Sequence, residues 1–450
     1  MSLRSCVTGA LALFAFAACQ TSAPGEGSTT HERCLHPECV PDELSQDAHV
    51  GDDTSLGGDA PDESLEEPQL VREARLSGLL NYIDEGPEPR LESSDGDTSV
   101  FVFEGDEGPI CMRGEPFRFS YRERGSDKLL VFLQGGGTCW SDFCLTVIAA
   151  SAGIPMVDAL DPDNPSNPMS DWNVLYLPYC DGSFFTGDRD FDENGDGKGD
   201  RLHRGLQNLS GALRKARVLM PDPERVLLTG SSAGAFGTIP ATVLVRAVYP
   251  EATLQVFNDS GVGVARPDEP AFVEKILDEQ GLIPLFPESC EACWGDGHIT
   301  RLVHWIFERD DAVQMAVFSS MHDSVIAGTF LDIDADIFQE TMLKETHALH
   351  ERFPERYKRF IVQGVAHTTL LGTPVGIIGE DLSALEFSSD ALSGLSGIRL
   401  GGLDSTTIGE VSAGDWLRAF VEGDPAWVDM IEPEASEEEL EPADEQGEDE

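Results

Sequence analysis

Ser232 lies at the centre of a Gly-x-Ser-x-Gly pentapeptide, Gly230-Ser-Ser-Ala-Gly234, which follows an apolar run that begins at Val226. This order is typical of a nucleophile elbow, a sharp strand-to-helix turn that lifts a serine hydroxyl clear of a sheet. The two glycines let neighbouring backbone pass without Cβ clashes. The pattern predicts a serine nucleophile for acyl transfer, and the alternative from the pentapeptide alone is an ordinary strand-to-helix turn.

A second glycine-rich turn, Gly135-Gly-Gly137, follows another apolar run that begins at Leu129. In α/β-hydrolases, backbone N–H groups from such a turn and from the residue after the nucleophile bind the oxyanion together. We therefore expect one half of an oxyanion hole from Gly136 and Gly137 and the other half from Ala233. A phosphate-binding loop is the competing interpretation, but neither of its glycine signatures follows this run.

The chain also offers an acid and a base after the nucleophile, in the order that this kind of hydrolase requires. Asp323 and His367 each follow an apolar run, and the active sites of open α/β sheets lie beyond the carboxyl ends of the strands. Asp259 is a rival acid. His347 and His350 are rival bases, but their segment predicts an amphipathic helix, where histidines more often face solvent. The sequence favours Asp323 and His367.

With these residues in place, the chain resembles the pectin acetylesterase and Notum carboxylesterase family between about Cys111 and His367. The resemblance implies an α/β-hydrolase-like fold, with a mostly parallel central sheet flanked by helices. It also implies ester hydrolysis by a triad of Ser232, His367 and Asp323. Ala235 departs from the family, which commonly has glycine there, so substrate identity does not transfer. Four blocks carry the resemblance: Gln134–Trp140, Tyr179–Asp188, Gly230–Gly234 and Gly364–His367.

The cysteines are compatible with disulfides, because the amino terminus predicts export from the cytosol. The family resemblance implies the pairs Cys111–Cys180 and Cys139–Cys144, which would brace the oxyanion turn. We expect Cys34–Cys39 and Cys290–Cys293 as local pairs. Zinc is the rival interpretation of Cys290-Glu-Ala-Cys293, but no second close thiol or histidine pair accompanies it.

Export is predicted from residues 1–18, in which Arg4 precedes an apolar stretch that is too short to span a bilayer. The stretch ends in Phe-Ala-Ala before Cys19, which resembles the cleavage site of bacterial lipoprotein signals. We expect Cys19 to be the lipidated first residue of the mature chain, and the alternative is an ordinary signal peptide. The lipid anchor would be the protein's one contact with a membrane.

An acidic segment offers oxygen ligands on alternate residues, namely Asp190, Asp192, Asn194 and Asp196. This spacing resembles the first half of a calcium loop, although Arg201 stands where the bidentate glutamate is expected. A solvated acidic turn is the alternative interpretation. Any Ca²⁺ would be structural, because the serine chemistry requires no cofactor.

Composition divides the rest of the chain. We expect an acidic disordered tether at 19–70, one catalytic domain at 71–430 and an acidic disordered tail at 431–450. The formal net charge of −52 excludes nucleic acid as a partner, because phosphate binding requires clustered lysine and arginine. Acidic surfaces also repel polyanions, which argues against a direct transfer of pectin as the substrate.

Two functions follow from these patterns. The first is an exported serine carboxylesterase that removes O-acyl groups, in the simplest case O-acetyl, from a small molecule or a polysaccharide. The second is a surface binding or adhesion lipoprotein that keeps the hydrolase fold without turnover. The combination of serine, base and oxyanion glycines favours the enzyme, because a binding protein needs none of the three.

Overall fold

The computed structural model describes residues 67–373, 382–388 and 398–434. All of the described residues belong to one compact unit. The predicted signal peptide, Cys19 and the expected Cys34–Cys39 pair lie outside the described residues. The first helix begins at Gln69 and the last strand ends at Ile431, so the ordered elements extend slightly into the expected tether and tail.

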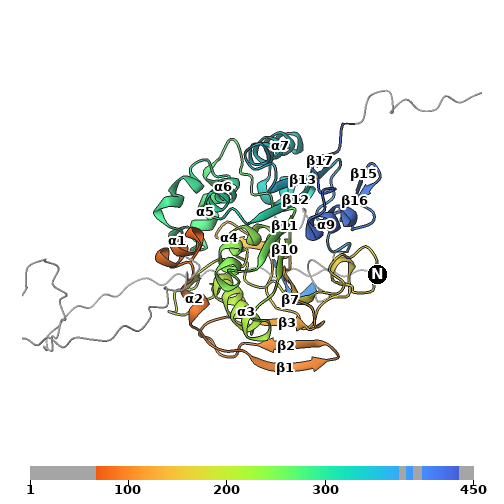
Figure 1. The fold of residues 1–450 in the computed structure, drawn as a ribbon. Helices are drawn as coiled ribbons and strands as arrows, with labels where there is room; N and C mark the ends of the chain where they lie inside the picture. The colour runs from red at the N-terminus through yellow and green to blue at the C-terminus, as the bar shows by residue number, and fades with distance from the viewer. Residues whose placement is uncertain (1–66, 374–381, 389–397, 435–450) are drawn as a thin grey trace, which may run out of the picture. The chain divides into compact units, whose positions relative to one another are not determined.

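A ten-stranded sheet forms the centre of this unit (Figure 1), in the order β1-β2-β3-β7-β4-β10-β11-β12-β13-β17. Neighbouring strands from β7 to β17 are parallel, while β1, β2 and β3 add an antiparallel edge next to β7. The predicted mostly parallel α/β sheet is confirmed. Its strands are β1 (Arg90–Asp95), β2 (Thr98–Val102), β3 (Arg118–Arg122), β4 (Lys128–Leu133), β7 (Asn173–Leu177), β10 (Arg225–Ser231), β11 (Thr253–Asp259), β12 (Gln314–Ser320), β13 (Tyr357–Val362) and β17 (Met430–Ile431).

Helices cover both faces of the sheet (Figure 1). Helices α3, α4, α6 and α7 contribute to one hydrophobic core, and α9 contributes to the other. Within the described part of the chain, no helix is both long and apolar enough to cross a membrane. The α-helices are α1 (Gln69–Ser77), α2 (Asn81–Asp84), α3 (Gly205–Leu219), α4 (Ala233–Val248), α5 (Ala271–Glu279), α6 (Thr300–Arg309), α7 (Ala335–Arg352) and α9 (Ala413–Glu422).

Strand β4 illustrates how the sequence builds these two cores. Leu129, Val131 and Leu133 belong to the core beneath α3 and α4, whereas Leu130 and Phe132 belong to the core beneath α9. All five side chains are fully buried. A continuous apolar run is expected for a parallel strand that is covered on both faces, because successive side chains point to opposite sides.

Smaller elements complete the fold. A π-helical segment, η4, follows β12, and a three-stranded sheet has the order β14-β6-β5. These elements are η4 (Ser324–Leu331), β5 (Gly137–Trp140), β6 (Phe143–Val147) and β14 (Leu385–Phe387), with the pairs β8 (Arg189–Phe191) and β9 (Arg201–His203), and β15 (Thr407–Ile408) and β16 (Val411–Ser412). The short 3₁₀ helices are η1 (Asp158–Leu160), η2 (Ile283–Leu285), η3 (Glu288–Trp294) and η5 (Leu382–Ala384).

Candidate active site

Ser232 occupies the turn between β10 and α4, with φ 57° and ψ −121°. A positive φ is uncommon for a residue other than glycine and costs on the order of 1–3 kcal/mol, so the surrounding structure must impose it. The turn is tight, because a Cβ at Gly234 would lie 2.1 Å from the carbonyl oxygen of Leu133. Ala233 begins α4, where backbone N–H groups have no acceptor within the helix. The local geometry is that of a nucleophile elbow.

The glycine turn after β4 approaches this elbow. Gly137 has φ 81°, and a Cβ there would lie 1.9 Å from the carbonyl oxygen of Leu145 on the opposite strand, β6. Gly137 and Ala233 line the same cavity as Ser232, whereas Gly136 precedes that lining. The structure therefore brings two of the three expected oxyanion donors to the serine. Their role in binding an oxyanion stays a prediction.

Asp323 and His367 are in direct contact. Asp323 lies beyond the end of β12 and is fully buried, and its Oδ2 is 2.8 Å from Nδ1 of His367, in the loop after β13. The other carboxylate oxygen accepts hydrogen bonds from the backbone N–H groups of Val325 and Ile326, each at 3.0 Å. Because three donors fix this carboxylate, it can hold the imidazole in one orientation.

The second ring nitrogen of His367, Nε2, is buried and has no hydrogen-bond partner among the described residues. Serine–histidine hydrogen bonds are often long or absent before substrate binds. An imidazole that is bonded to a carboxylate on one side and free on the other can accept a proton there. This ring is the base that the order of motifs predicts, and its catalytic role stays a prediction.

Asp259, the rival acid, ends β11 and contacts backbone and hydroxyl groups. Its Oδ2 accepts hydrogen bonds from Ser231 Oγ at 2.6 Å and from the N–H of Leu370 at 3.1 Å. Its Oδ1 accepts from the N–H of Thr369 at 2.7 Å, and its carbonyl oxygen accepts from the N–H of Ser232 at 2.9 Å. Asp259 therefore joins the nucleophile elbow to the loop that carries the histidine.

Burial in this position raises the pKa of Asp259 to about 6, against the hydrogen bonds that favour its charged form. The carboxyl group is fully buried, so its ionised form loses the hydration that it has in the unfolded chain. Asp259 and Asp323 both lie close to His367, because Asp259 accepts hydrogen bonds from the backbone that follows the histidine and Asp323 contacts its ring.

Strained backbone gathers at this edge of the sheet. Besides Ser232, the residues Ser260 and Thr368 have positive φ values of 69° and 64°. Ser260 follows Asp259, and its Oγ accepts a hydrogen bond from the N–H of Thr368 at 3.0 Å. Neither residue was predicted from the sequence. The available signal was their place after apolar strand-like runs, which is where Asp323 and His367 were found.

The rival histidines lie in α7, away from the carboxyl end of β13. Nδ1 of His350 is 2.8 Å from the carbonyl oxygen of Tyr357, the first residue of β13, whereas His367 follows the last. His347 is exposed. The structure therefore does not bring either side chain to the carboxyl ends of the strands.

The cavity beside Ser232 has a volume of about 50 Å³ and an almost wholly apolar lining. Its walls come from β5 and β6, from the loop before β8, from α4 and from η4. These segments are far apart in the sequence, so local patterns do not predict that they meet. The apolar side chains that line the cavity are Phe143, Leu145, Phe184, Ala233, Phe236, Val325, Ile326 and Phe330.

Three disulfides lie in the described part of the chain, and they are the expected ones. Cys139 and Cys144 face each other across the hairpin of β5 and β6, which begins at Gly137. The pair Cys111–Cys180 and the pair Cys290–Cys293 are also bonded. The Cys290–Cys293 bond leaves no thiolate for the zinc site considered above.

The carboxylates of the acidic segment face its own backbone and nearby arginines. Asp192 accepts hydrogen bonds from the N–H groups of Gly195 and Gly197 at 2.6 and 2.7 Å, and its pKa is lowered, with the Gly197 bond as the largest cause. Asp190 is 2.6 Å from Arg204. Among the residues described, the cluster of potential ligands close enough for a metal is Cys139, Cys144 and Glu386, whose sulfurs form a disulfide. Calcium binding by Asp190, Asp192, Asn194 and Asp196 stays a prediction.

Comparison with known proteins gives one family. Residues 92–276 match the family model described as pectinacetylesterase, a range that includes Ser232 and ends before Asp323 and His367. No curated protein matches. The solved structure of the Wnt deacylase Notum from Drosophila is 18% identical, with a TM-score of 0.49, and the alignment covers 72% of this chain and 93% of that one. The family match over residues 92–276 agrees with the resemblance seen in the sequence, and the protein is a carboxylic ester hydrolase.

Proposed function

We propose that the protein hydrolyses small O-acyl esters through a covalent acyl–Ser232 intermediate, with His367 as base and Asp323 as acid. The hydrogen-bond network of Asp259 carries this proposal. It connects Ser231, next to the nucleophile, with Thr369 and Leu370, just after the histidine. This network supports a site in which the serine and the unpaired Nε2 of the imidazole act on the same substrate.

In the proposed reaction, Nε2 of His367 takes the proton of Ser232 as its Oγ attacks the ester carbonyl carbon. The N–H groups of Gly137 and Ala233, with that of Gly136, stabilise the oxyanion, and losing one such donor typically costs about 3–4 kcal/mol. The C–O bond then breaks, and the alcohol leaves with the proton from His367. Water attacks the acyl-enzyme through the same base, which releases the carboxylic acid and restores the serine. Asp323 holds the imidazole and stabilises its charged form.

The substrate that we propose carries a short acyl group, in the simplest case O-acetyl, on a carbohydrate or polysaccharide. The volume of about 50 Å³ supports a short acyl group, since a single water-sized group needs about 10–15 Å³. The absence of charged side chains from the cavity lining supports an apolar acyl end. The net charge of −52 favours a neutral polysaccharide over a polyanion such as de-esterified pectin.

We also propose that the protein is exported and anchored by lipid at Cys19. The three disulfides support export, because disulfides persist in oxidising compartments. Lipidation rests on the sequence of residues 1–18 and on the position of Cys19. Intact-mass analysis of the protein purified from bacterial membranes tests it, and an unmodified Cys19 in a soluble mature chain would leave plain secretion.

The esterase is tested with purified protein on p-nitrophenyl acetate and on an O-acetylated neutral polysaccharide, with acetate release as the measurement. A fluorophosphonate probe should label the wild-type protein at Ser232 and should not label Ser232→Ala. Binding of the polysaccharide without acetate release or probe labelling would contradict the esterase and favour the surface binding protein instead.

A further inference from the structure

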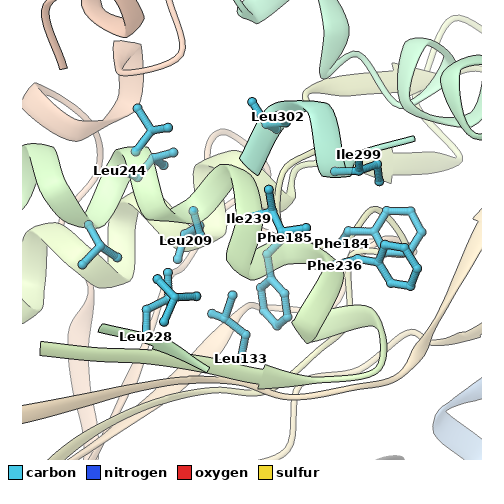
Figure 2. Close-up of a cluster of buried hydrophobic side chains, with 14 of the residues drawn as sticks. Leu133, Phe184, Phe185, Leu209, Leu228, Phe236, Ile239, Leu244, Ile299 and Leu302 are labelled. Carbon is cyan, nitrogen blue, oxygen red and sulfur yellow. The ribbon is translucent and has the colours of Figure 1, made fainter. Parts of the chain in front are cut away.

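A second apolar cavity, of about 10 Å³, lies next to the one beside Ser232. Leu277 of α5, Trp294 of η3 and Leu302 of α6 form its far side. Phe184 and Phe236 line both cavities, so the two rings separate them. Figure 2 shows these rings side by side, with Ile299 next to them and Leu302 beyond. No charged side chain lines either cavity.

The two rings form a continuous wall together with a third, Phe330 of η4. The centroids of Phe184 and Phe236 are 5.4 Å apart, and Phe330 lies 6.0 Å from the first and 5.4 Å from the second. Each ring touches the other two. An acyl chain that enters from Ser232 therefore meets aromatic edges and faces before it can reach Leu277 or Leu302.

The wall is held by the same backbone that forms the elbow. Phe236 lies in the first turn of α4, and its N–H donates to the carbonyl oxygen of Ser232 at 3.1 Å. Phe184 has a positive φ of 57°, and its N–H donates to Tyr179 Oη at 2.9 Å. A Cβ at Gly237 would lie 2.4 Å from the carbonyl oxygen of Phe184, so these two segments are in close contact. The backbone that carries the two rings is therefore tied to the elbow.

We propose that Phe184 and Phe236 determine acyl-chain length, confining hydrolysis to acyl groups of about two to four carbons. The cavity next to Ser232 is large enough for only a few non-hydrogen atoms. Removal of the Phe236 ring joins the two cavities into one apolar channel, because core truncations of this kind leave cavities that collapse only in part. The proposal rests on the esterase function proposed above.

The test is a series of p-nitrophenyl esters from acetate to octanoate, hydrolysed by the wild type, Phe236→Ala and Phe272→Ala. Phe272 is a matched control, because its ring packs against Trp140 and Phe330 but lines neither cavity. The ratio of kcat/KM for octanoate to that for acetate should rise at least about tenfold in Phe236→Ala, because each additional buried CH₂ favours binding. It should stay unchanged in Phe272→Ala.

Equal rates on octanoate and acetate in the wild type, or an unchanged ratio in an active Phe236→Ala, would overturn the proposal. If Phe236→Ala does not fold, Phe236→Leu and Phe184→Leu take its place, with a smaller expected rise. Calorimetric binding of 1-octanol requires no turnover. If the wild type hydrolyses no ester and only Phe236→Ala binds 1-octanol, the proposed esterase function is refuted. The proposal that the two rings block access to the second cavity then still stands. Equal binding of 1-octanol to both would refute the wall.

Discussion

Asp259 ends β11 and Asp323 follows the neighbouring strand, β12. Both side chains are fully buried, yet they contact different parts of the site. Asp323 bonds to the imidazole of His367, whereas Asp259 bonds to the hydroxyl of Ser231 and to the backbone after the histidine. Two carboxylates with the same burial can thus have different tasks. The groups that face each carboxylate decide which task it has.

The register of the strands accounts for the difference. Asp259 pairs with Ser231 of β10, so it lies beside the elbow on the adjacent strand. Asp323 lies three residues beyond the end of β12, and the neighbouring strand, β13, leads into the loop of His367. Backbone pairing with the neighbouring strand holds a residue such as Asp259 in place. A residue beyond the end of its strand, such as Asp323, can turn toward the next loop.

The largest expected effect is that of Ser232→Ala, and the loss of kcat in this variant is the reference for the two aspartate variants. Loss of the attacking oxygen should lower kcat by on the order of 10⁴- to 10⁶-fold. Turnover of p-nitrophenyl acetate measures it, and circular dichroism checks the fold. If the variant kept its activity, neither aspartate could be compared as part of a serine site.

His367→Ala should lose activity to a similar extent, because the proton acceptor is missing. His350→Ala serves as the control, since His350 bonds to the first residue of β13 and lies away from the elbow. Steady-state kinetics of the two variants measure the effect. If His350→Ala lost more activity than His367→Ala, the assignment of His367 as base would be wrong. The assignment of Asp323 as acid would then be wrong as well.

Asp323→Asn and Asp259→Asn test the comparison directly. Asp323→Asn should lower kcat by roughly 10⁴-fold, because an amide favours the wrong imidazole tautomer. Asp259→Asn should lower it by about 10–100-fold with little change in KM, because an NH₂ group would face donors from Ser231, Thr369 or Leu370. If Asp259→Asn were the more damaging change, the two roles would be reversed.

The stability of Asp259→Asn relative to the wild type should depend on pH. The pKa of Asp259 is raised from 3.8 to about 6 on folding, so between these values the native state binds more protons than the unfolded chain. The contribution of this group to the unfolding free energy is therefore complete below about pH 4 and is lost as the pH rises through 6. Asparagine does not titrate in this range. As the pH rises from about 4 to 6, the unfolding free energy of the variant should therefore increase relative to that of the wild type, and above pH 6 the difference should stay constant. Urea unfolding at a series of pH values measures the difference, and a flat profile would contradict the raised pKa.

The smallest expected effect concerns carboxylates outside the site, in the segment from Asp190 to Asp196. Millimolar Ca²⁺ should raise Tm without changing turnover, because an ion bound to the native state alone stabilises it by mass action. Scanning calorimetry after chelation measures it, with Asp192→Ala and Asp196→Ala as controls. An unchanged Tm up to millimolar Ca²⁺ would show that these carboxylates bind no calcium and serve only contacts within the protein.

The sequence by itself predicts the features that depend on neighbouring residues or on chain order. The elbow at Ser232 needs only consecutive residues, and the sheet follows from apolar runs such as Leu129–Leu133. The family resemblance adds the disulfide Cys139–Cys144, which spans a short hairpin. His367 could be found because the carboxyl ends of parallel strands meet at one edge, whatever their order in the sheet.

Only the tertiary structure decided which groups each of these residues faces. Asp259 and Asp323 look alike as single acids after apolar runs, and the register and the loops separate their roles. The wall of Phe184 and Phe236 was not visible in the sequence either, because its rings come from segments about 50 residues apart and meet only when α4 packs against the loop before β8. Local patterns determine turns and strands, but contacts between distant side chains exist only after the core has been assembled.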